Sequence, residues 1–131
     1  MKIKVIRQSI EILKENIDLL HIFYYDEEHK EWWKVASYTD DMDIECISRC
    51  IAEGLNNYFS GEGFEVVYDS EWHDCECCGS FTIDTTTIAK GNASIEVIED
   101  SHMGYGTRGW SDEEIIEDWK VFGHDVEIED V

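Results

Sequence analysis

The segment FTIDTTTIAKGNASIEVIE (residues 81–99) contains two runs in which apolar side chains alternate with polar or β-branched ones. Side chains on a strand point to opposite faces in turn, so residues 81–89 and 93–99 each predict a strand. The intervening residues 90–92, Lys-Gly-Asn, are typical of a turn. This segment predicts two neighbouring strands of a sheet, around which the rest of the chain is arranged.

Further strands are expected on both sides of this segment. Alternation, or an excess of aromatic and β-branched residues, marks residues 2–6, 21–25, 32–38 and 64–72. The tail 124–131 also alternates and is expected to add an edge strand.

Three helices are expected between these strands. Residues 9–20 begin with a possible N-cap, Ser9. Residues 41–59 carry the clearest helical stripe of apolar side chains. Ser111 and Glu114 form a capping box that starts a third helix, ending at Gly123. The apolar stripes behind these predictions are Ile10, Leu13, Ile17 and Leu20; Ile44, Ile47, Ile51, Leu55 and Tyr58; and Ile115, Ile116, Trp119 and Phe122.

The order of these elements defines the expected fold class. The chain has 131 residues, enough for one domain with one core. Strands and helices do not alternate as repeated βαβ units, which makes a doubly wound sheet unlikely to form. The sequence predicts a single α+β domain over residues 1–131. In it, a mostly antiparallel sheet of five or six strands is packed by two or three helices.

The charge restricts the function. Ten basic residues against 31 acidic ones give a net charge of −21. Affinity for phosphate requires Lys and Arg, so direct binding of nucleic acid or of an anionic membrane is disfavoured. A basic protein partner remains compatible with this charge, and residues 96–131 are the most acidic part, with only Arg108 and Lys120 as basic residues.

The expected location is the cytoplasm. No long apolar run follows the N-terminal charges, and no stretch approaches the ~18 apolar residues of a membrane span. The five cysteines are odd in number and clustered, which favours a reducing compartment over a disulfide scaffold.

The cysteines leave two interpretations open. Cys75 and Cys77 share a strand face if that segment is extended, and Cys46 and Cys50 share a helix face. Together these four residues could bind structural zinc, although they lack the paired CxxC spacing of zinc ribbons. The preferred interpretation is that no metal binds and that the helix cysteines are buried apolar residues.

No catalytic motif stands out. The chain lacks HExxH, GxSxG, a Walker loop and a GxGxxG that follows a strand. Carboxylates are so numerous that a pair at catalytic spacing carries little information. We therefore expect a protein that is not an enzyme and has no cofactor.

The loop SHMGYGTRGW (residues 101–110) is the strongest candidate for a binding site. Its three glycines allow close approach of the backbone to a ligand, and Tyr105 and Trp110 offer flat faces for stacking. Arg108 would add a guanidinium, which suits a nucleotide-like ligand. Alternatively, Arg108 is an ion pair that holds the loop, or the segment is a surface loop without a ligand.

The order of Phe81, Asn92, Arg108 and Trp110 before a terminal helix resembles small phage-encoded Thoeris anti-defence sponge proteins. The resemblance implies a protein that binds a cyclic ADP-ribose signal without cleaving it and assembles as a dimer or larger oligomer. Phe81 would then stack on a base, and Asn92 and Arg108 would bond its polar groups. It also implies action in the cytoplasm of the host cell.

Three functions are therefore expected, in this order. The first is a non-catalytic homo-oligomeric protein that sequesters a small nucleotide-derived signal. The second is an acidic inhibitor that imitates DNA and binds a basic nucleic-acid enzyme. The third is a zinc-stabilised interaction domain. The residues expected to bind the small ligand are Phe81, Asn92, Tyr105, Arg108 and Trp110.

Overall fold

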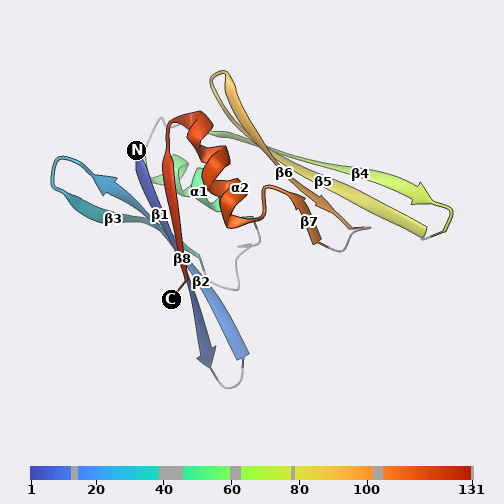
Figure 1. The fold of residues 1–131 in the computed structure, drawn as a ribbon, viewed down its shortest axis with the longest axis horizontal. Coiled ribbons are helices and arrows are strands. Elements are labelled where there is room, and N and C mark those ends of the chain that lie inside the picture. Colours follow the sequence, from blue (N-terminus) through green and yellow to red (C-terminus); the bar gives the residue numbers. More distant parts are fainter. Residues whose placement is uncertain (13–14, 39–45, 60–62, 78, 102–104, 131) are drawn as a thin grey trace.

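The computed structural model describes residues 1–12, 15–38, 46–59, 63–77, 79–101 and 105–130. The α+β class is confirmed, with mostly antiparallel strands. Instead of one sheet of five or six strands, the described residues form eight strands in two four-stranded sheets, with two α-helices between them (Figure 1).

The first sheet is built from the two ends of the chain. Its strand order is β3 (Glu31–Tyr38), β2 (Glu15–Asp26), β1 (Lys2–Ile12) and β8 (Asp125–Asp130). Neighbours are antiparallel except β1 and β8, which are parallel. The predicted edge strand at the tail is confirmed, since β8 stands at the end of this order.

The second sheet contains the segment 81–99. Its order is β4 (Glu65–Cys75), β5 (Gly79–Lys90), β6 (Ala93–Asp100) and β7 (Tyr105–Arg108), all antiparallel. Gly91 adopts a φ of 62° in the β5–β6 turn, a backbone conformation that favours glycine. The two predicted strands and their turn are confirmed. The distal part of the β4–β5 hairpin extends away from the helices (Figure 1).

The predicted helix over residues 9–20 is wrong. Residues 9–12 belong to β1 and residues 15–20 to β2, with Ser9 paired with Asp18 and Ile10 with Ile17; residues 13–14 lie outside the described residues. The apolar residues fit both periods, since Ile10 and Ile12 are two residues apart as on a strand, while Ile10, Leu13 and Ile17 have helical spacing. Pairing of the extended backbone with the neighbouring strand decides between the two periods.

The other helices are present with adjusted bounds. Helix α1 (Ile47–Tyr58) occupies the described part of the predicted helix 41–59; residues 39–45 lie outside the described residues. Helix α2 (Asp112–Trp119) continues into a 3-10 turn, η1 (Lys120–Phe122), and ends at Gly123 with a φ of 79°. Ser111 caps α2 by accepting from the Glu114 amide at 3.2 Å, as the capping box predicts.

One core joins both sheets and both helices. The buried residues of α1 include Ile51 and Leu55, and Trp119 of α2 is fully buried. Helix α1 approaches the first sheet closely, since a Cβ at Gly54 would lie 3.1 Å from the Cβ of Ala36. The remaining core members come mainly from the sheets: Ile3, Val5, Leu20, Ile22, Phe64, Ile88, Ile95, Ile115 and Val126. No helix in the described part of the chain is long and apolar enough to cross a membrane.

Candidate functional site

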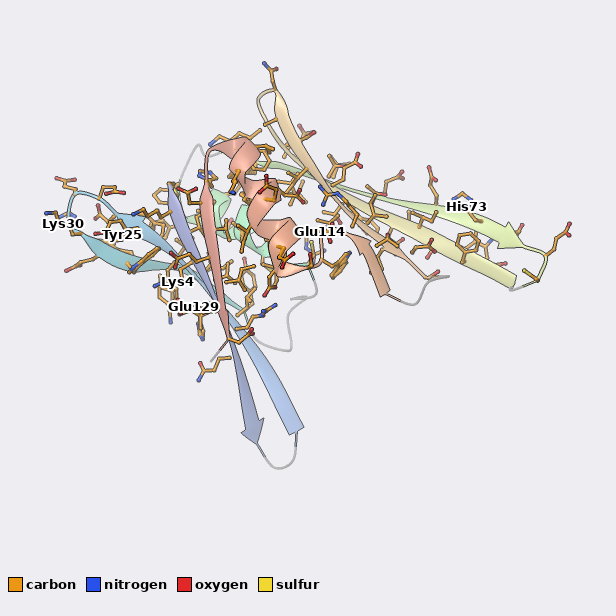
Figure 2. The ribbon with its side chains drawn as sticks, in the orientation of Figure 1. Lys4, Tyr25, Lys30, His73, Glu114 and Glu129 are labelled. Carbon is orange, nitrogen blue, oxygen red and sulfur yellow. The ribbon has the colours of Figure 1, made fainter. Side chains whose placement is uncertain are left out.

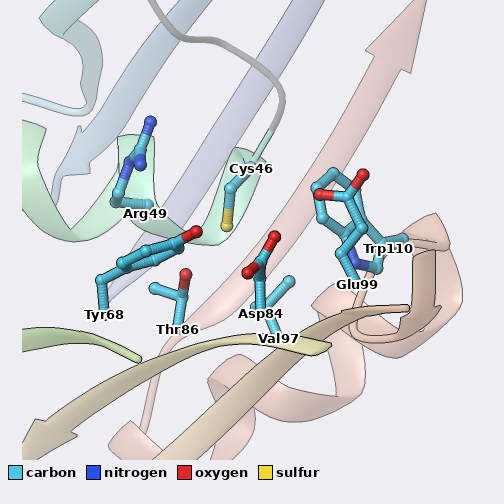
Figure 3. Close-up of a pocket in the computed structure, with 8 residues that line it drawn as sticks. All are labelled: Cys46, Arg49, Tyr68, Asp84, Thr86, Val97, Glu99 and Trp110. Carbon is cyan, nitrogen blue, oxygen red and sulfur yellow. The ribbon is translucent and has the colours of Figure 1, made fainter. Parts of the chain in front are cut away.

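A pocket of about 200 Å³ lies between the start of α1 and one face of the second sheet (Figure 3). Helix α1 and the residue before it supply Arg49 and Cys46, which lie above the sheet in this view. The remaining lining residues come from the sheet and its end: Tyr68, Asp84, Thr86, Val97, Glu99 and Trp110.

Strand register places the sheet residues of this pocket side by side. Tyr68 of β4 pairs with Thr86 of β5, and Asp84 of β5 pairs with Glu99 of β6. Asp84 and Thr86 are two residues apart on one strand, so their side chains share a face. On this face of the sheet Thr86 is buried, whereas the side chain of Tyr68 on β4 is 62% exposed.

The pocket combines two carboxylates with one guanidinium. Asp84 accepts a hydrogen bond from the Ser70 hydroxyl at 2.6 Å, while the Arg49 guanidinium lies 3.9 Å from Glu53, one turn along α1. Partial removal from water, together with a hydrogen bond to Asp84, raises the pKa of Tyr68 above its usual value of 10.0. A phenol is neutral at pH 7 in any case, so Tyr68 is a hydrogen-bond donor in this pocket.

Of the predicted site residues whose side chains the structure describes, Trp110 alone lines this pocket. Its indole Nε1 donates a hydrogen bond to the Ile98 carbonyl oxygen at 2.9 Å. This bond fixes the ring at the end of the sheet, where it supplies a flat surface next to Glu99 (Figure 3).

The segment 101–110 is only partly a loop, because Tyr105–Arg108 forms β7 and pairs with β6. Tyr105 pairs with Asp100 through the backbone; its side chain lies outside the described residues. Gly109 has a φ of 81° and packs closely, since a Cβ there would lie 3.0 Å from the Glu96 carbonyl oxygen. This glycine is required by packing in the folded chain.

Arg108 is held by carboxylates of α2. Its Nη1 donates to Asp118 Oδ2 at 2.9 Å and to Glu114 Oε2 at 3.3 Å. Glu114 also accepts from the Gly109 amide at 3.0 Å, and this bond lowers the pKa of Glu114 below its ordinary value. Of the two interpretations of Arg108, these contacts support the ion pair that holds the segment.

Phe81 and Asn92 lie at opposite ends of the β5–β6 region. Phe81 stacks on His73 across the β4–β5 hairpin, with ring centroids 5.3 Å apart and planes 17° apart. Figure 2 shows His73 far out on this hairpin. Phe81 and Lys90 are nine positions apart on β5, roughly 30 Å at 3.3 Å per residue, and Asn92 lies just beyond. One chain does not bring Phe81 and Asn92 together.

The four cysteines of the zinc hypothesis are also separated. Cys46 and Cys50 are buried, and Cys46 lines the same pocket as Tyr68. Cys75 lies seven residues further along β4 than Tyr68, roughly 23 Å at 3.3 Å per residue, next to Cys77. Within the described residues, no group of three or more His, Cys, Asp or Glu could hold a metal ion.

No family model, no curated protein and no solved structure matches this chain. The pocket and the distribution of charge are therefore the observations that bear on function. Arg49, Tyr68, Asp84 and Glu99 were not expected as site residues. The sequence shows that Tyr68 is an aromatic residue in a predicted strand. Only the strand register and the position of α1 show that it lies opposite Thr86 and beneath the helix.

Proposed function

We propose that the protein is a non-catalytic binding protein that sequesters a small nucleotide-derived molecule in the pocket between α1 and the second sheet. The observation that carries this proposal is the lining itself, in which Tyr68 and Trp110 offer aromatic rings and Arg49 offers a guanidinium. Aromatic rings stack on bases of any sequence, and Arg binds phosphate oxygens in a bidentate manner.

The two carboxylates of the pocket suit the polar groups of such a ligand. Asp84 and Glu99 are acceptors when ionised, so they favour ribose hydroxyls and exocyclic amines over a second phosphate. The three formally charged side chains of the lining, Arg49, Asp84 and Glu99, sum to −1, which disfavours a ligand with many phosphates. A base with a ribose and one or two phosphates is the ligand class that this lining supports.

The proposed role is counter-defence: a phage protein that binds a cyclic ADP-ribose-type signal in the host cytoplasm and keeps it from its receptor. Binding alone is sufficient for this role, since the ligand only has to be withheld. A homo-oligomer is part of the proposal, because a second copy could bring Phe81 or Asn92 close to a ligand that one chain holds at Trp110.

Titration calorimetry with adenosine monophosphate, ADP-ribose and cyclic ADP-ribose tests the proposal. We expect at least one of them to bind, and Arg49→Ala and Trp110→Ala each to weaken its binding about tenfold. Lys34→Ala is the matched control, since it removes one exposed positive charge from the first sheet. Binding that both pocket variants leave unchanged would refute the site, and no binding of any ligand would refute the function.

A second candidate function is an acidic inhibitor of a basic protein. Residues 65–100, which contain β4, β5 and β6, carry nine acidic residues and one basic residue, Lys90, a net of −8. A complex formed through this charge would associate fast and weaken steeply as salt is added. Affinity for an arginine-rich peptide that is the same at low and high salt would contradict this second candidate.

A further inference from the structure

Strand β4 stands at the end of the second sheet. Among the described residues it pairs with β5 only, so its other side presents backbone N–H and C=O groups to a further strand. At 11 residues it is twice the usual length of a strand. Its distal half lies on the hairpin that extends away from the helices (Figure 1).

Large apolar side chains are exposed along this edge. Tyr68 and Trp72 lie four residues apart and therefore on the same face, and they are 62% and 69% exposed. Val67 on the opposite face is 49% exposed. These are among the most exposed large apolar side chains in the described part of the chain, and three of them fall within six residues of β4.

Acidic side chains lie on the opposite face of the same strand. Asp69 and Glu71 alternate with Tyr68, Ser70 and Trp72, and both are exposed. Charged residues on an edge strand commonly prevent aggregation. That role explains Asp69 and Glu71, but it does not explain two exposed aromatic rings on the same strand.

A second copy of the chain is a poor occupant of this edge. Antiparallel self-pairing centred on Ser70 would place Asp69 of one copy opposite Glu71 of the other, on both sides of the symmetry axis. Like charges directly opposite each other on neighbouring strands are destabilising. A strand with arginine or lysine at those positions would instead form opposite-charge pairs.

We propose that the free edge of β4 binds an extended, arginine- or lysine-rich segment of a partner protein by strand addition. Backbone hydrogen bonds to β4 would supply affinity. Basic side chains on one face would pair with Asp69 and Glu71, and β-branched apolar side chains on the other would pack against Tyr68 and Trp72. This inference rests on the second candidate function and names its contact surface and its mode of binding.

Two synthetic peptides test the proposal by calorimetry at low salt. One alternates arginine and valine. The other has the same length and number of arginines, but proline replaces each valine and cannot donate to a β-ladder. We expect the valine peptide to bind at least about tenfold more tightly, because only it can add a strand to β4. Hydrogen exchange of the β4 amides should slow in its presence.

Matched variants locate the site. We expect Asp69→Lys/Glu71→Lys to weaken the valine peptide about tenfold or more, and Trp72→Ala, which lies outside the pocket, to weaken it severalfold. The control is Glu127→Lys/Glu129→Lys on β8, which makes the same charge change on the edge strand of the first sheet. We expect it to change the affinity about twofold, through net charge alone. Thermal unfolding checks that each variant is folded.

The remaining outcomes distinguish a failure of strand addition to β4 from a failure of the acidic-inhibitor function. Equal binding of both peptides, or equal loss in both double variants, would overturn strand addition and leave the acidic inhibitor standing. No binding of either peptide would overturn both. A dimer whose β4 amides are already protected without peptide would assign the edge to a second copy and overturn the proposal.

Discussion

The indole Nε1 of Trp119 donates a hydrogen bond to the Ser48 hydroxyl at 3.1 Å, and both side chains are buried. The bond joins α2 to α1 across 71 positions of the chain, inside the core that both sheets share. It links the helix that carries Arg49 to the helix that follows Trp110, and both of these residues line the pocket.

We expect Ser48→Ala to destabilise the protein by about 1–3 kcal/mol, because it leaves a buried indole N–H without its acceptor. The free energy of unfolding in urea measures this loss. Ser94→Ala, at an exposed position of β6, serves as the control and should change it by no more than about 0.5 kcal/mol. Equal effects of the two variants would show that the bond contributes nothing specific.

Gly109 and Gly91 make a second matched pair. Both have positive φ, 81° and 62°, so alanine at either position costs about 1–2 kcal/mol in backbone conformation. A Cβ at Gly91 would meet nothing within 4 Å, whereas at Gly109 it would lie 3.0 Å from Glu96 O and 3.2 Å from Val97 Cγ2. Urea unfolding should therefore show a clearly larger loss for Gly109→Ala, and equal losses would contradict the close approach of β7 to β6.

The Arg108–Asp118 pair predicts a non-additive double mutant. Asp118 is 8% exposed, so Arg108→Ala leaves a buried carboxylate without its partner and should cost about 1–3 kcal/mol. Asp118→Asn in the same chain should recover part of that loss. Ligand affinity at the pocket should change little in folded Arg108→Ala protein; a tenfold loss of affinity would return Arg108 to the ligand site.

Ionisation of Tyr38 is expected to lower the free energy of unfolding at high pH. Burial raises its pKa to about 12 from an ordinary value of 10.0, and its hydroxyl donates to the Cys50 carbonyl oxygen at 3.1 Å. The fold thus prefers the neutral phenol, a preference that carries no pH dependence below pH 10 and is lost as pH rises from 10 to about 12. Unfolding free energies across this range should fall less steeply in Tyr38→Phe than in the wild type; parallel curves would rule this out.

Treatment with a chelator tests whether the four cysteines bind zinc. Because Cys46 and Cys50 lie in the core while Cys75 and Cys77 lie at the hairpin tip, we expect EDTA to leave the Tm unchanged. Elemental analysis of protein purified without chelator should give a zinc-to-protein ratio near zero. A ratio near one, with a drop in Tm on chelation, would show that the cysteines do bind metal.

The local features of the chain were predictable from short-range patterns. Alternation over residues 81–99 predicted β5 and β6, the apolar stripe predicted α1, and Ser111 with Glu114 predicted the start of α2. The helix predicted over residues 9–20 was wrong because the apolar residues there fit both the period of a strand and that of a helix. A hydrogen-bonded neighbour decides between them, and a neighbour is not a local property.

The candidate site was predictable only at Trp110. Arg49, Tyr68 and Glu99 come from elements far apart in the chain, and register and helix placement bring them to one pocket. The resemblance to anti-defence sponge proteins grouped Phe81 with Asn92, yet an extended β5 keeps them apart in one chain. Arg108 looked available in the sequence, but Asp118, ten residues later, faces it across the turn into α2.

By itself, the sequence determined the α+β class, the strands β5 and β6, the helices α1 and α2 and the net charge of −21, since these depend on side-chain identity and short-range periodicity. Only the tertiary structure decided that the strands form two sheets, that Arg108 is held by Asp118, and that β4 pairs on one side only among the described residues. Each of these depends on which distant segments pair, and a strand's pattern specifies its faces without specifying its neighbour.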